Sequence, residues 1–281
     1  MYRLCNSFNI KKKKEMKNKR IFISGGSGVI GRDLIKKLIS RGAKVMTGDL
    51  VSLPKDLRKK VIFRKGDLNY IKKKYISNFK PEIFIHLAAK FERVEESKKH
   101  WENNFWHNVR LSHYLMGLMK EISSVKKIIN ASSYLIYDKK LYTSKFKKKP
   151  YCLKEEDPLD PRNLTGGAKL FNEVELEYLN KVKNKKLIFI SARIFRGYGK
   201  GSRDIISRWV KDALKNKTLK VYNDKNSFDY INSHDTSLGL ISLCKVSKSG
   251  IFNLASGKST KISSILKILK ETFPNENKYQ S

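Results

Sequence analysis

The sequence has 281 residues, of which 40% are hydrophobic and 31% charged, as is typical of a globular chain with a sizeable buried core. Its longest apolar runs, such as Ile83-Phe84-Ile85, are of strand length, whereas a membrane helix needs roughly 18 apolar residues, so we expect no membrane span. Residues 1–20 include basic side chains but no apolar segment of signal-peptide length, so we expect no export signal.

The formal net charge of +35 would attract polyphosphates, which raises the possibility of a nucleic-acid-binding protein. However, the 61 basic residues are spread along the whole chain, and only thirteen of them are arginine. The basic clusters 11–14 and 145–149 contain a single aromatic residue, Phe146, on which a base could stack. We therefore do not expect a function in nucleic-acid binding, and we keep an RNA-binding protein only as an alternative to the functions considered below.

Cysteine and histidine are scattered along the chain. The three cysteines, Cys5, Cys152 and Cys244, have no paired spacing, which argues against a disulfide framework and against a zinc site. The five histidines have no metal-binding pattern either, so we predict no metal. This usage is typical of a reducing compartment, and we expect a cytoplasmic protein.

From residue 19 onward, short β-rich runs alternate with amphipathic stretches. The pattern predicts a strand at 19–24, a helix at 29–40, strands at 43–47 and 61–64, a helix at 68–79, a strand at 82–87, a helix at 100–121, a strand at 126–131, a helix at 169–181, a strand at 187–192, and helices at 204–215, 235–244 and 261–272. Such alternation is typical of an α/β protein whose parallel sheet has helices on both faces. The loop at 138–164 is long for a compact domain and would follow the carboxyl end of a strand, where ligands bind.

The strongest motif is Ser24-Gly25-Gly26-Ser27-Gly28-Val29-Ile30-Gly31, between a predicted strand and a predicted helix. Glycine permits the tight turn, the close approach of a pyrophosphate and close packing of the helix on the strand, while the helix N-terminus offers N–H groups and its positive dipole end. Asp49 ends the next strand, where a carboxylate can accept both ribose hydroxyls and would repel a 2′-phosphate. These residues predict a Rossmann-type site for NAD, with a structural glycine turn capped by Asp49 as the alternative.

We accordingly divide the chain into a basic tail at 1–17, expected to be disordered and containing Met16 as an alternative start, a Rossmann-type domain at 18–195, and a short α/β substrate cap at 196–281 that is interleaved with it.

Further motifs resemble those of the extended short-chain dehydrogenases/reductases of the NAD-dependent epimerase/dehydratase family. They follow in order over residues 19–270: Gly66-Asp67-Leu68, His86-Leu87-Ala88-Ala89, Asn108-Val109, Ser132-Ser133 with Tyr137, Lys169, Arg193 with Tyr198-Gly199, and Asp229-Tyr230-Ile231 with Asp235. The resemblance implies that the cofactor is held by Gly25, Gly28, Val29, Ile30, Gly31, Asp49, Asp67, Leu68, Leu87, Ala88, Ala89, Asn108 and Lys169.

In the family, a serine, a tyrosine and a lysine move a proton while a hydride passes to NAD. Ser133 and Lys169 match the serine and the lysine, but Thr165 occupies the tyrosine position, and its hydroxyl is too weak an acid to carry a proton near neutral pH. Tyr134 is a candidate proton carrier because it adjoins Ser133, and a tyrosine packed under the loop at 138–164 is the alternative. The Asp-Glu pair typical of dehydratases is absent, since Tyr134-Leu135 stands in its place.

The resemblance implies a nucleotide-sugar substrate, a 4-keto intermediate and a homodimer formed by helices 100–121 and 169–181. Phe228 replaces an arginine that grips the diphosphate in relatives, and we expect Arg196 and Arg203 to supply that charge unless they pair with carboxylates. Leu111, Leu115, Leu118 and Met119 have a spacing that suits either the dimer interface or the core. A catalytically degenerate member that binds NAD or a sugar nucleotide, as a sensor or partner subunit, is the alternative function.

Overall fold

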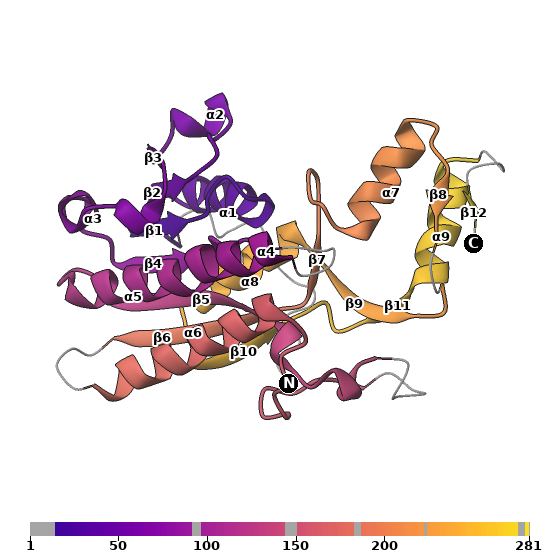
Figure 1. Cartoon of the computed structure of the whole chain (residues 1–281). Coiled ribbons are helices and arrows are strands. Elements are labelled where there is room, and N and C mark those ends of the chain that lie inside the picture. Colours follow the sequence, from indigo (N-terminus) through magenta and orange to yellow (C-terminus); the bar gives the residue numbers. More distant parts are fainter. Residues whose placement is uncertain are drawn as a thin grey trace.

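Seven parallel strands form the central sheet, in the order β10-β6-β5-β4-β1-β2-β3 (Figure 1). The computed structural model describes residues 15–91, 97–143, 151–182, 187–221, 224–274 and 279–280. The strands of this sheet are β1 (Arg20–Ser24), β2 (Lys44–Asp49), β3 (Ile62–Lys65), β4 (Ile83–His86), β5 (Lys127–Ser133), β6 (Ile188–Ile194) and β10 (Gly250–Leu254).

Helices cover both faces of the sheet and bury two separate apolar cores. Successive residues of a strand point to opposite faces, so Ile21 and Ile23 of β1 join one core while Phe22 joins the other. The first core lies under α1 (Val29–Ser40), α2 (Lys55–Arg58) and α8 (Ser233–Leu243). The second lies under α3 (Lys73–Phe79), α5 (Leu111–Glu121) and α6 (Leu164–Lys181), and Figure 1 shows α5 and α6 in front of the sheet, lying roughly along its strands. The prediction of a doubly wound, Rossmann-type α/β fold is confirmed.

The order of the sheet places a ligand site beside β1. The chain proceeds from β1 outward to β2 and β3, then crosses back to β4 on the other side of β1. Such a reversal leaves a crevice at the carboxyl ends of the strands, where open α/β sheets bind ligands. The glycine motif lies at this point, between β1 and α1.

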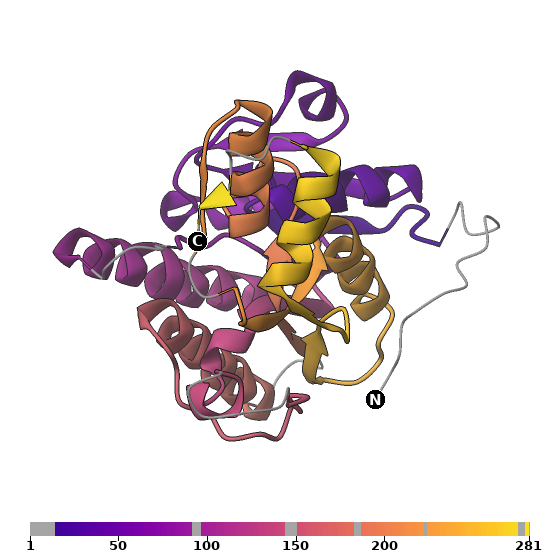
Figure 2. The same ribbon diagram turned by 90° about the vertical axis from the view of Figure 1, so that its right-hand side faces the viewer.

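A smaller lobe stands at this end of the sheet and has its own core around Trp209 (Figure 2). Its elements are β7 (Arg196–Tyr198), α7 (Ile205–Leu214), β8 (Leu219–Lys220), β9 (Ser227–Asn232), β11 (Ser259–Lys261), α9 (Ile262–Thr272) and β12 (Tyr279–Gln280). Helices α7 and α9 lie side by side, joined by the contact of Trp209 with Ile262 and Ile265. Because α8 and β10 return to the larger lobe, the two lobes are interleaved along the chain.

The structure corrects the expected end of the tail. Residues 1–14 lie outside the described part, but Glu15 to Asn18 form a turn, and Met16 is buried in the core against α1. The N–H of Met16 donates to the carbonyl of Arg41 at 3.2 Å. Residues 15–18 therefore belong to the fold, because the buried Met16 anchors them before β1 begins.

Two helices differ from the expected single spans. The stretch at 100–121 consists of α4 (Lys98–Asn104), a π-helical segment η2 (Phe105–Arg110) and α5, and the stretch at 68–79 is a 3₁₀ turn, η1 (Leu68–Tyr70), followed by α3. Helix α6 begins five residues earlier than expected because the side chain of Asn163 caps it by accepting from the N–H of Gly166 at 2.9 Å. Thr165 consequently lies in the first turn of α6.

The loop between β5 and α6 contains two short helical turns, η3 (Tyr134–Ile136) and η4 (Lys139–Leu141). Its described parts are fixed to one another by an isolated bridge between Tyr137 and Leu159. The basic cluster at 145–149 lies outside the described residues. Among those that are described, no helix is long and apolar enough to cross a membrane.

Candidate active site

The glycine turn after β1 leaves no room for side chains. Gly25 has a φ of +80°, and a Cβ there would lie 2.6 Å from the backbone nitrogen of Ala88. A Cβ on Gly31 would lie 2.5 Å from the carbonyl oxygen of Gly25. The first contact presses the turn against the end of β4 and the second presses α1 against the turn, so glycine is required at both positions.

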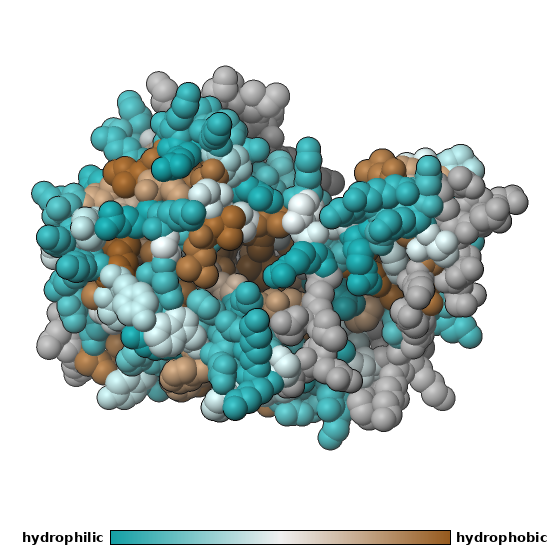
Figure 3. All heavy atoms as spheres, turned by 45° about the horizontal axis from the view of Figure 1, so that its top comes forward, coloured by the Kyte–Doolittle hydropathy of each residue, from teal (hydrophilic) through white to brown (hydrophobic). Residues whose placement is uncertain are grey.

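The N-terminus of α1 is open to a ligand. Its cap residue, Gly28, supplies no side-chain hydrogen bond, so the N–H groups of the first turn have no capping acceptor. They face a cavity of about 200 Å³ lined by Gly25, Gly28, Val29, Ile30, Gly31, Leu87, Ala131, Gly197, Tyr198, Ser202 and Ser233. A hollow with hydrophobic surface is visible between the two lobes in Figure 3. Free N–H groups at a helix N-terminus suit the anionic pyrophosphate of a dinucleotide.

Asp49, at the end of β2, is hydrogen-bonded to the same turn. Its Oδ2 accepts from the N–H of Ser27 at 2.9 Å, and its Oδ1 accepts from the N–H of Val51 at 3.0 Å. A carboxylate offers about four acceptor positions, two on each oxygen. One position therefore stays available on each oxygen, which suits the adjacent hydroxyls of a ribose.

Asp67 lies at the predicted adenine position and is also held by neighbours. Burial would raise its pKa, but hydrogen bonds from the indole of Trp106 and from Asn69 outweigh this effect and lower the pKa. Trp106 Nε1 donates to Oδ2 at 2.7 Å, and both the backbone and the side-chain amide of Asn69 donate to Oδ1. Asp67 and Leu68 line a second hollow rather than the cavity on α1.

Asn108 holds the segment that follows β4. Its side-chain carbonyl accepts from the N–H of Lys90, and its amide donates to the carbonyl of Lys90 and to Asn104, each at 2.7 Å. The whole residue is buried. Asn108 thus positions the segment that contains Leu87, Ala88 and Ala89 instead of lining the cavity itself.

His86 is buried and neutral. Its Nδ1 lies 2.6 Å from Ser24 Oγ and its Nε2 lies 2.8 Å from Ser112 Oγ. Ser112 gives its only hydroxyl proton to the carbonyl of Asn108 at 2.8 Å, so Nε2 of His86 must donate to Ser112 and Nδ1 must accept from Ser24. Burial, assisted by the charge of Lys169, lowers the pKa of His86 to about 3. His86 is therefore too weak a base to take a proton from a substrate near neutral pH.

Lys169 and Thr165 lie one turn apart on α6, and both are buried against β5. Burial lowers the pKa of Lys169 to about 8, and the nearby Glu173 only partly offsets this effect. The hydroxyl of Thr165 is buried without a hydrogen-bond partner among the described residues, as are the polar side-chain atoms of Asn130 and Ser132 on β5. Buried polar atoms are usually paired, so this group marks a place where a bound ligand could supply hydrogen bonds.

Ser133 and Tyr134 follow directly at the end of β5. The hydroxyl of Ser133 is partly exposed and accepts from the N–H of Leu135 at 3.2 Å. The ring of Tyr134 stacks on Phe195 and meets Tyr142 edge-on, each with a centroid distance of 5.5 Å. Tyr134 therefore packs under the loop at 138–164, which was the alternative to a catalytic role. Its role as a proton carrier stays a prediction.

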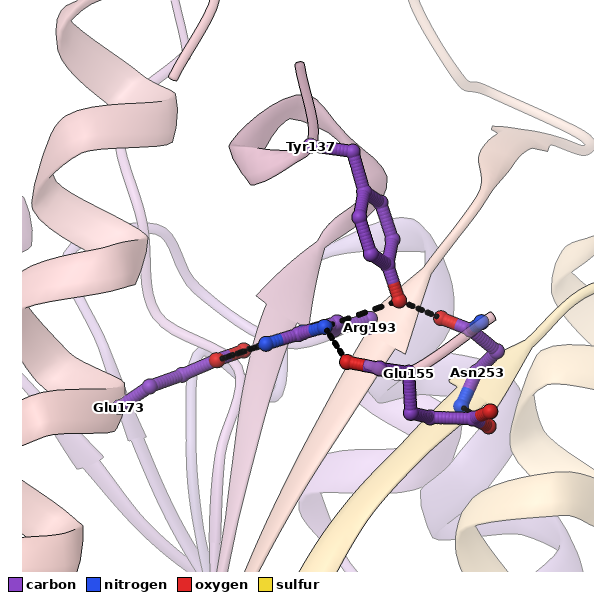
Figure 4. A network of polar contacts seen from close by, with 5 residues as sticks. All are labelled: Tyr137, Glu155, Glu173, Arg193 and Asn253. Carbon is purple, nitrogen blue, oxygen red and sulfur yellow. Dashed lines mark hydrogen bonds and ion pairs between the residues drawn. The ribbon is translucent and has the colours of Figure 1, made fainter. Parts of the chain in front are cut away.

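A buried ion pair joins β6 to α6 and to the loop between β5 and α6 (Figure 4). Arg193 of β6 donates to Glu173 of α6 through Nε at 3.1 Å and Nη2 at 2.8 Å. Its Nη1 donates to the hydroxyl of Tyr137 at 2.9 Å and to the carbonyl of Glu155 at 2.8 Å. Tyr137 donates onward to Asn253 of β10. Burial raises the pKa of Tyr137 despite the opposing effect of Arg193, so this phenol stays protonated near neutral pH.

Of the predicted substrate residues, Arg196 and Phe228 lie together. The guanidinium of Arg196 lies 3.8 Å above the ring of Phe228, so the two side chains are in contact. Arg203 is exposed, in the segment before α7. The alternative was that Arg196 and Arg203 pair with carboxylates. Neither arginine forms such an ion pair among the described residues.

The cavity brings together six predicted cofactor residues and adds several that the sequence did not single out. Gly197, Ser202 and Ser233 are among the additions, and they approach from the smaller lobe and the start of α8. The hydroxyl of Ser233 donates to Asp33 of α1 at 2.6 Å, which fixes the edge of the cavity. The described residues include no group of three or more His, Cys, Asp or Glu that could hold a metal.

Residues 21–255 match the family described as the NAD dependent epimerase/dehydratase family. The chain belongs to this family. The resemblance noted in the sequence is confirmed, and NAD is the cofactor of the NAD-dependent epimerase/dehydratase family.

Known members of the family resemble the chain over most of its length. A dTDP-4-dehydro-6-deoxyglucose reductase of Escherichia coli is 25% identical over 271 residues, covering 89% of this chain and 80% of the relative. A putative UDP-glucose 4-epimerase of Methanocaldococcus jannaschii is 23% identical over 259 residues, covering 89% and 81%. The structure of MoeE5 in complex with UDP-glucuronic acid and NAD superposes with a TM-score of 0.81 at 21% identity, covering 93% of this chain and 84% of that one.

The buried Lys169 predicts a pH-dependent stability. Since its pKa is about 8 in the folded chain and about 10.5 when unfolded, the unfolded state binds more protons between these values. The free energy of unfolding should thus rise between pH 8 and 10.5, and below pH 8 the charged amine should cost up to roughly 3 kcal/mol. We expect Lys169→Met to stabilise the protein in urea denaturation at pH 7 and to lose this advantage toward pH 10.5.

Lys181→Met is the matched control, because Lys181 lies on the same helix with an exposed side chain. A stability difference for Lys169→Met that is the same at pH 7 and pH 10 would contradict the desolvation of the amine.

Proposed function

We propose that this chain is a cytoplasmic NAD-dependent oxidoreductase of the epimerase/dehydratase type that acts on a nucleotide sugar through a 4-keto intermediate, with an atypical active site. The observation that carries the proposal is the cavity at the uncapped N-terminus of α1, closed on its other side by Tyr198 and Ser202 of the smaller lobe. A site between a dinucleotide-binding turn and a separate lobe suits a reaction between a cofactor and a second ligand.

The residues of the larger lobe would hold the cofactor, which when bound accepts and returns a hydride. The first-turn N–H groups of α1 bind the pyrophosphate, and Asp49 accepts the adenosine ribose hydroxyls with its two spare acceptor positions. Asp67 and Leu68 meet the adenine, and Leu87, Ala88 and Ala89 line the floor behind the turn. Lys169 holds the nicotinamide ribose from α6.

The substrate would lie between Ser133 and the smaller lobe. Ser133 polarises the reacting oxygen, and Arg196, presented on the ring of Phe228, binds the diphosphate together with Arg203. The known relatives named above include enzymes of dTDP- and UDP-sugars, which supports a nucleotide sugar as the substrate class.

Cofactor choice tests the proposal directly. Two ribose hydroxyls can bind Asp49, whereas a 2′-phosphate would meet its negative charge, so we expect NAD to bind at least tenfold more tightly than NADP. Asp49→Ser removes the charge and should narrow this ratio. Titration calorimetry with both cofactors measures it, and mass spectrometry of the denatured protein shows whether NAD co-purifies. Binding of neither cofactor would refute the proposal.

The alternative of a degenerate, non-catalytic member rests on Thr165, whose buried hydroxyl cannot replace a phenol as a proton carrier. Thr165→Tyr should restore the acid–base group beside Lys169 and raise turnover of a nucleotide sugar by about 100-fold or more. Stopped-flow absorbance at the reduced-nicotinamide band, with UDP-glucose as the probe, reports the hydride transfer. Tyr134→Phe tests the other candidate, since it should abolish any wild-type transfer if Tyr134 carries the proton.

Equal rates for the wild-type chain and both variants would count against each of these assignments. Retained NAD with no transfer in any of the three proteins would favour the sensor or partner-subunit alternative.

A homodimer through α4 and α6 is the quaternary structure we propose. Exposed apolar residues lie on α4, on the adjoining η2 and on α6, namely Trp101, Phe105, Phe171, Val174 and Tyr178. Leu111, Leu115 and Met119 are buried in the core of the protomer. Their spacing suited either the dimer interface or the core, and packing in the core accounts for it. Exposed apolar side chains on neighbouring helices are typical of an interface.

Val174→Glu should convert a dimer into a monomer, because it places a charge in that face. Sedimentation velocity measures the change. Ile268→Glu on α9 is the control, since Ile268 is about as exposed (60% against 57%) but lies on the smaller lobe. A wild-type monomer at tens of micromolar would contradict the assignment.

A further inference from the structure

A second hollow, of about 220 Å³, lies at the edge strand β3 and shares no residue with the cavity on α1. It is lined by Arg64, Lys65, Gly66, Asp67, Leu68, Tyr70, Ile71, Lys72 and Tyr75. The set combines cations with exposed tyrosines, and the proposed reaction uses neither.

Arginines and aromatic rings are stacked around this hollow. The guanidinium of Arg64 lies 4.0 Å above the ring of Tyr75, and that of Arg110 lies 4.2 Å above Trp106. The rings of Tyr70 and Trp106 are 6.1 Å apart and tilted by 49°. Tyr70 is 68% exposed, which leaves most of its ring available to a further planar group. Exposed rings and guanidinium planes are surfaces on which nucleobases stack.

The charges around the hollow favour a polyanion. Three cations, Arg64, Lys65 and Lys72, line it against the single carboxylate of Asp67. That carboxylate accepts hydrogen bonds from Trp106 and Asn69, which direct it toward the protein. The hollow therefore presents a net charge of about +2 next to its aromatic rings, as a phosphate-carrying strand requires.

We propose that this surface binds single-stranded nucleic acid, with bases stacked on Tyr70 and on the Arg64–Tyr75 pair and with phosphates on Lys65 and Lys72. A duplex would not fit this chemistry, because its bases already stack on one another and expose no faces to tyrosine. The expectation drawn from the sequence took account only of the basic clusters 11–14 and 145–149, which contain the single aromatic residue Phe146. The segment 64–75 instead alternates cations with Tyr70 and Tyr75, and the fold brings these side chains around one hollow.

Fluorescence anisotropy of labelled dodeca-uridylate tests the proposal on the full chain, at 50, 100 and 200 mM NaCl. Loss of a base stack is worth about 1–3 kcal/mol, so Tyr70→Ala and Tyr75→Ala should each weaken binding by fivefold or more. Neither should change the salt dependence, because neither removes a cation. Lys65→Ala and Lys72→Ala should each reduce the slope of log affinity against log salt by about 0.7.

Tyr151→Ala is the control, since Tyr151 is about as exposed as Tyr75 (40% against 38%) but lies on the loop before α6. Equal losses for Tyr151→Ala and Tyr70→Ala, equal affinity for a duplex of the same length, or no binding at 50 mM salt would each overturn the proposal. The experiment is independent of any sugar-nucleotide turnover.

Discussion

The buried ion pair between Arg193 and Glu173 is the constraint on which the geometry of the active site depends (Figure 4). Their side chains are only 2% and 5% exposed, and charges buried so deeply are tolerated only when every partner is in place. Glu173, Tyr137 and the carbonyl of Glu155 together satisfy the guanidinium. The pair therefore joins β6, α6 and the loop at 151–157 in one arrangement, and it fixes the rotation of α6 that turns Thr165 and Lys169 toward β5.

This arrangement also sets the electrostatics of Lys169. Glu173 lies one turn further along α6, but its carboxylate is bound to Arg193, so it compensates the buried amine only partly and the pKa of Lys169 falls to about 8. Burial lowers the pKa of His86 and raises that of Tyr137, which removes both from acid–base work near neutral pH. Of Lys169, His86 and Tyr137, Lys169 alone therefore has a pKa near the working range, and Thr165 lies one turn before it on α6.

The sequence was sufficient wherever function depends on local backbone geometry. The turn from Gly25 to Gly31, the helix after it and the position of Asp49 follow from the pattern of one β-α-β unit, and the structure has them as predicted. It was insufficient where distant segments meet. The Arg193–Glu173 pair and the approach of Ser233 to Asp33 over 200 residues have no local pattern. The π-helical segment η2 could not be predicted because its apolar spacing resembles that of an α-helix. The early start of α6 could not be predicted either, because residues 164–168 include two glycines and no helical pattern, and only the side chain of Asn163 caps the helix there.

Asp67 shows how the cofactor site and the edge of the sheet depend on one another. Of its four acceptor positions, two on Oδ1 are taken by Asn69 and one on Oδ2 by Trp106, so one position on Oδ2 is left, and we propose this position for an adenine amino group. Trp106 is held by the same bond, and its ring in turn lies under the guanidinium of Arg110. Substituting Trp106 would free Oδ2 and also remove the ring under Arg110, so the proposed adenine contact and the basic, aromatic surface beside it depend on one shared hydrogen bond.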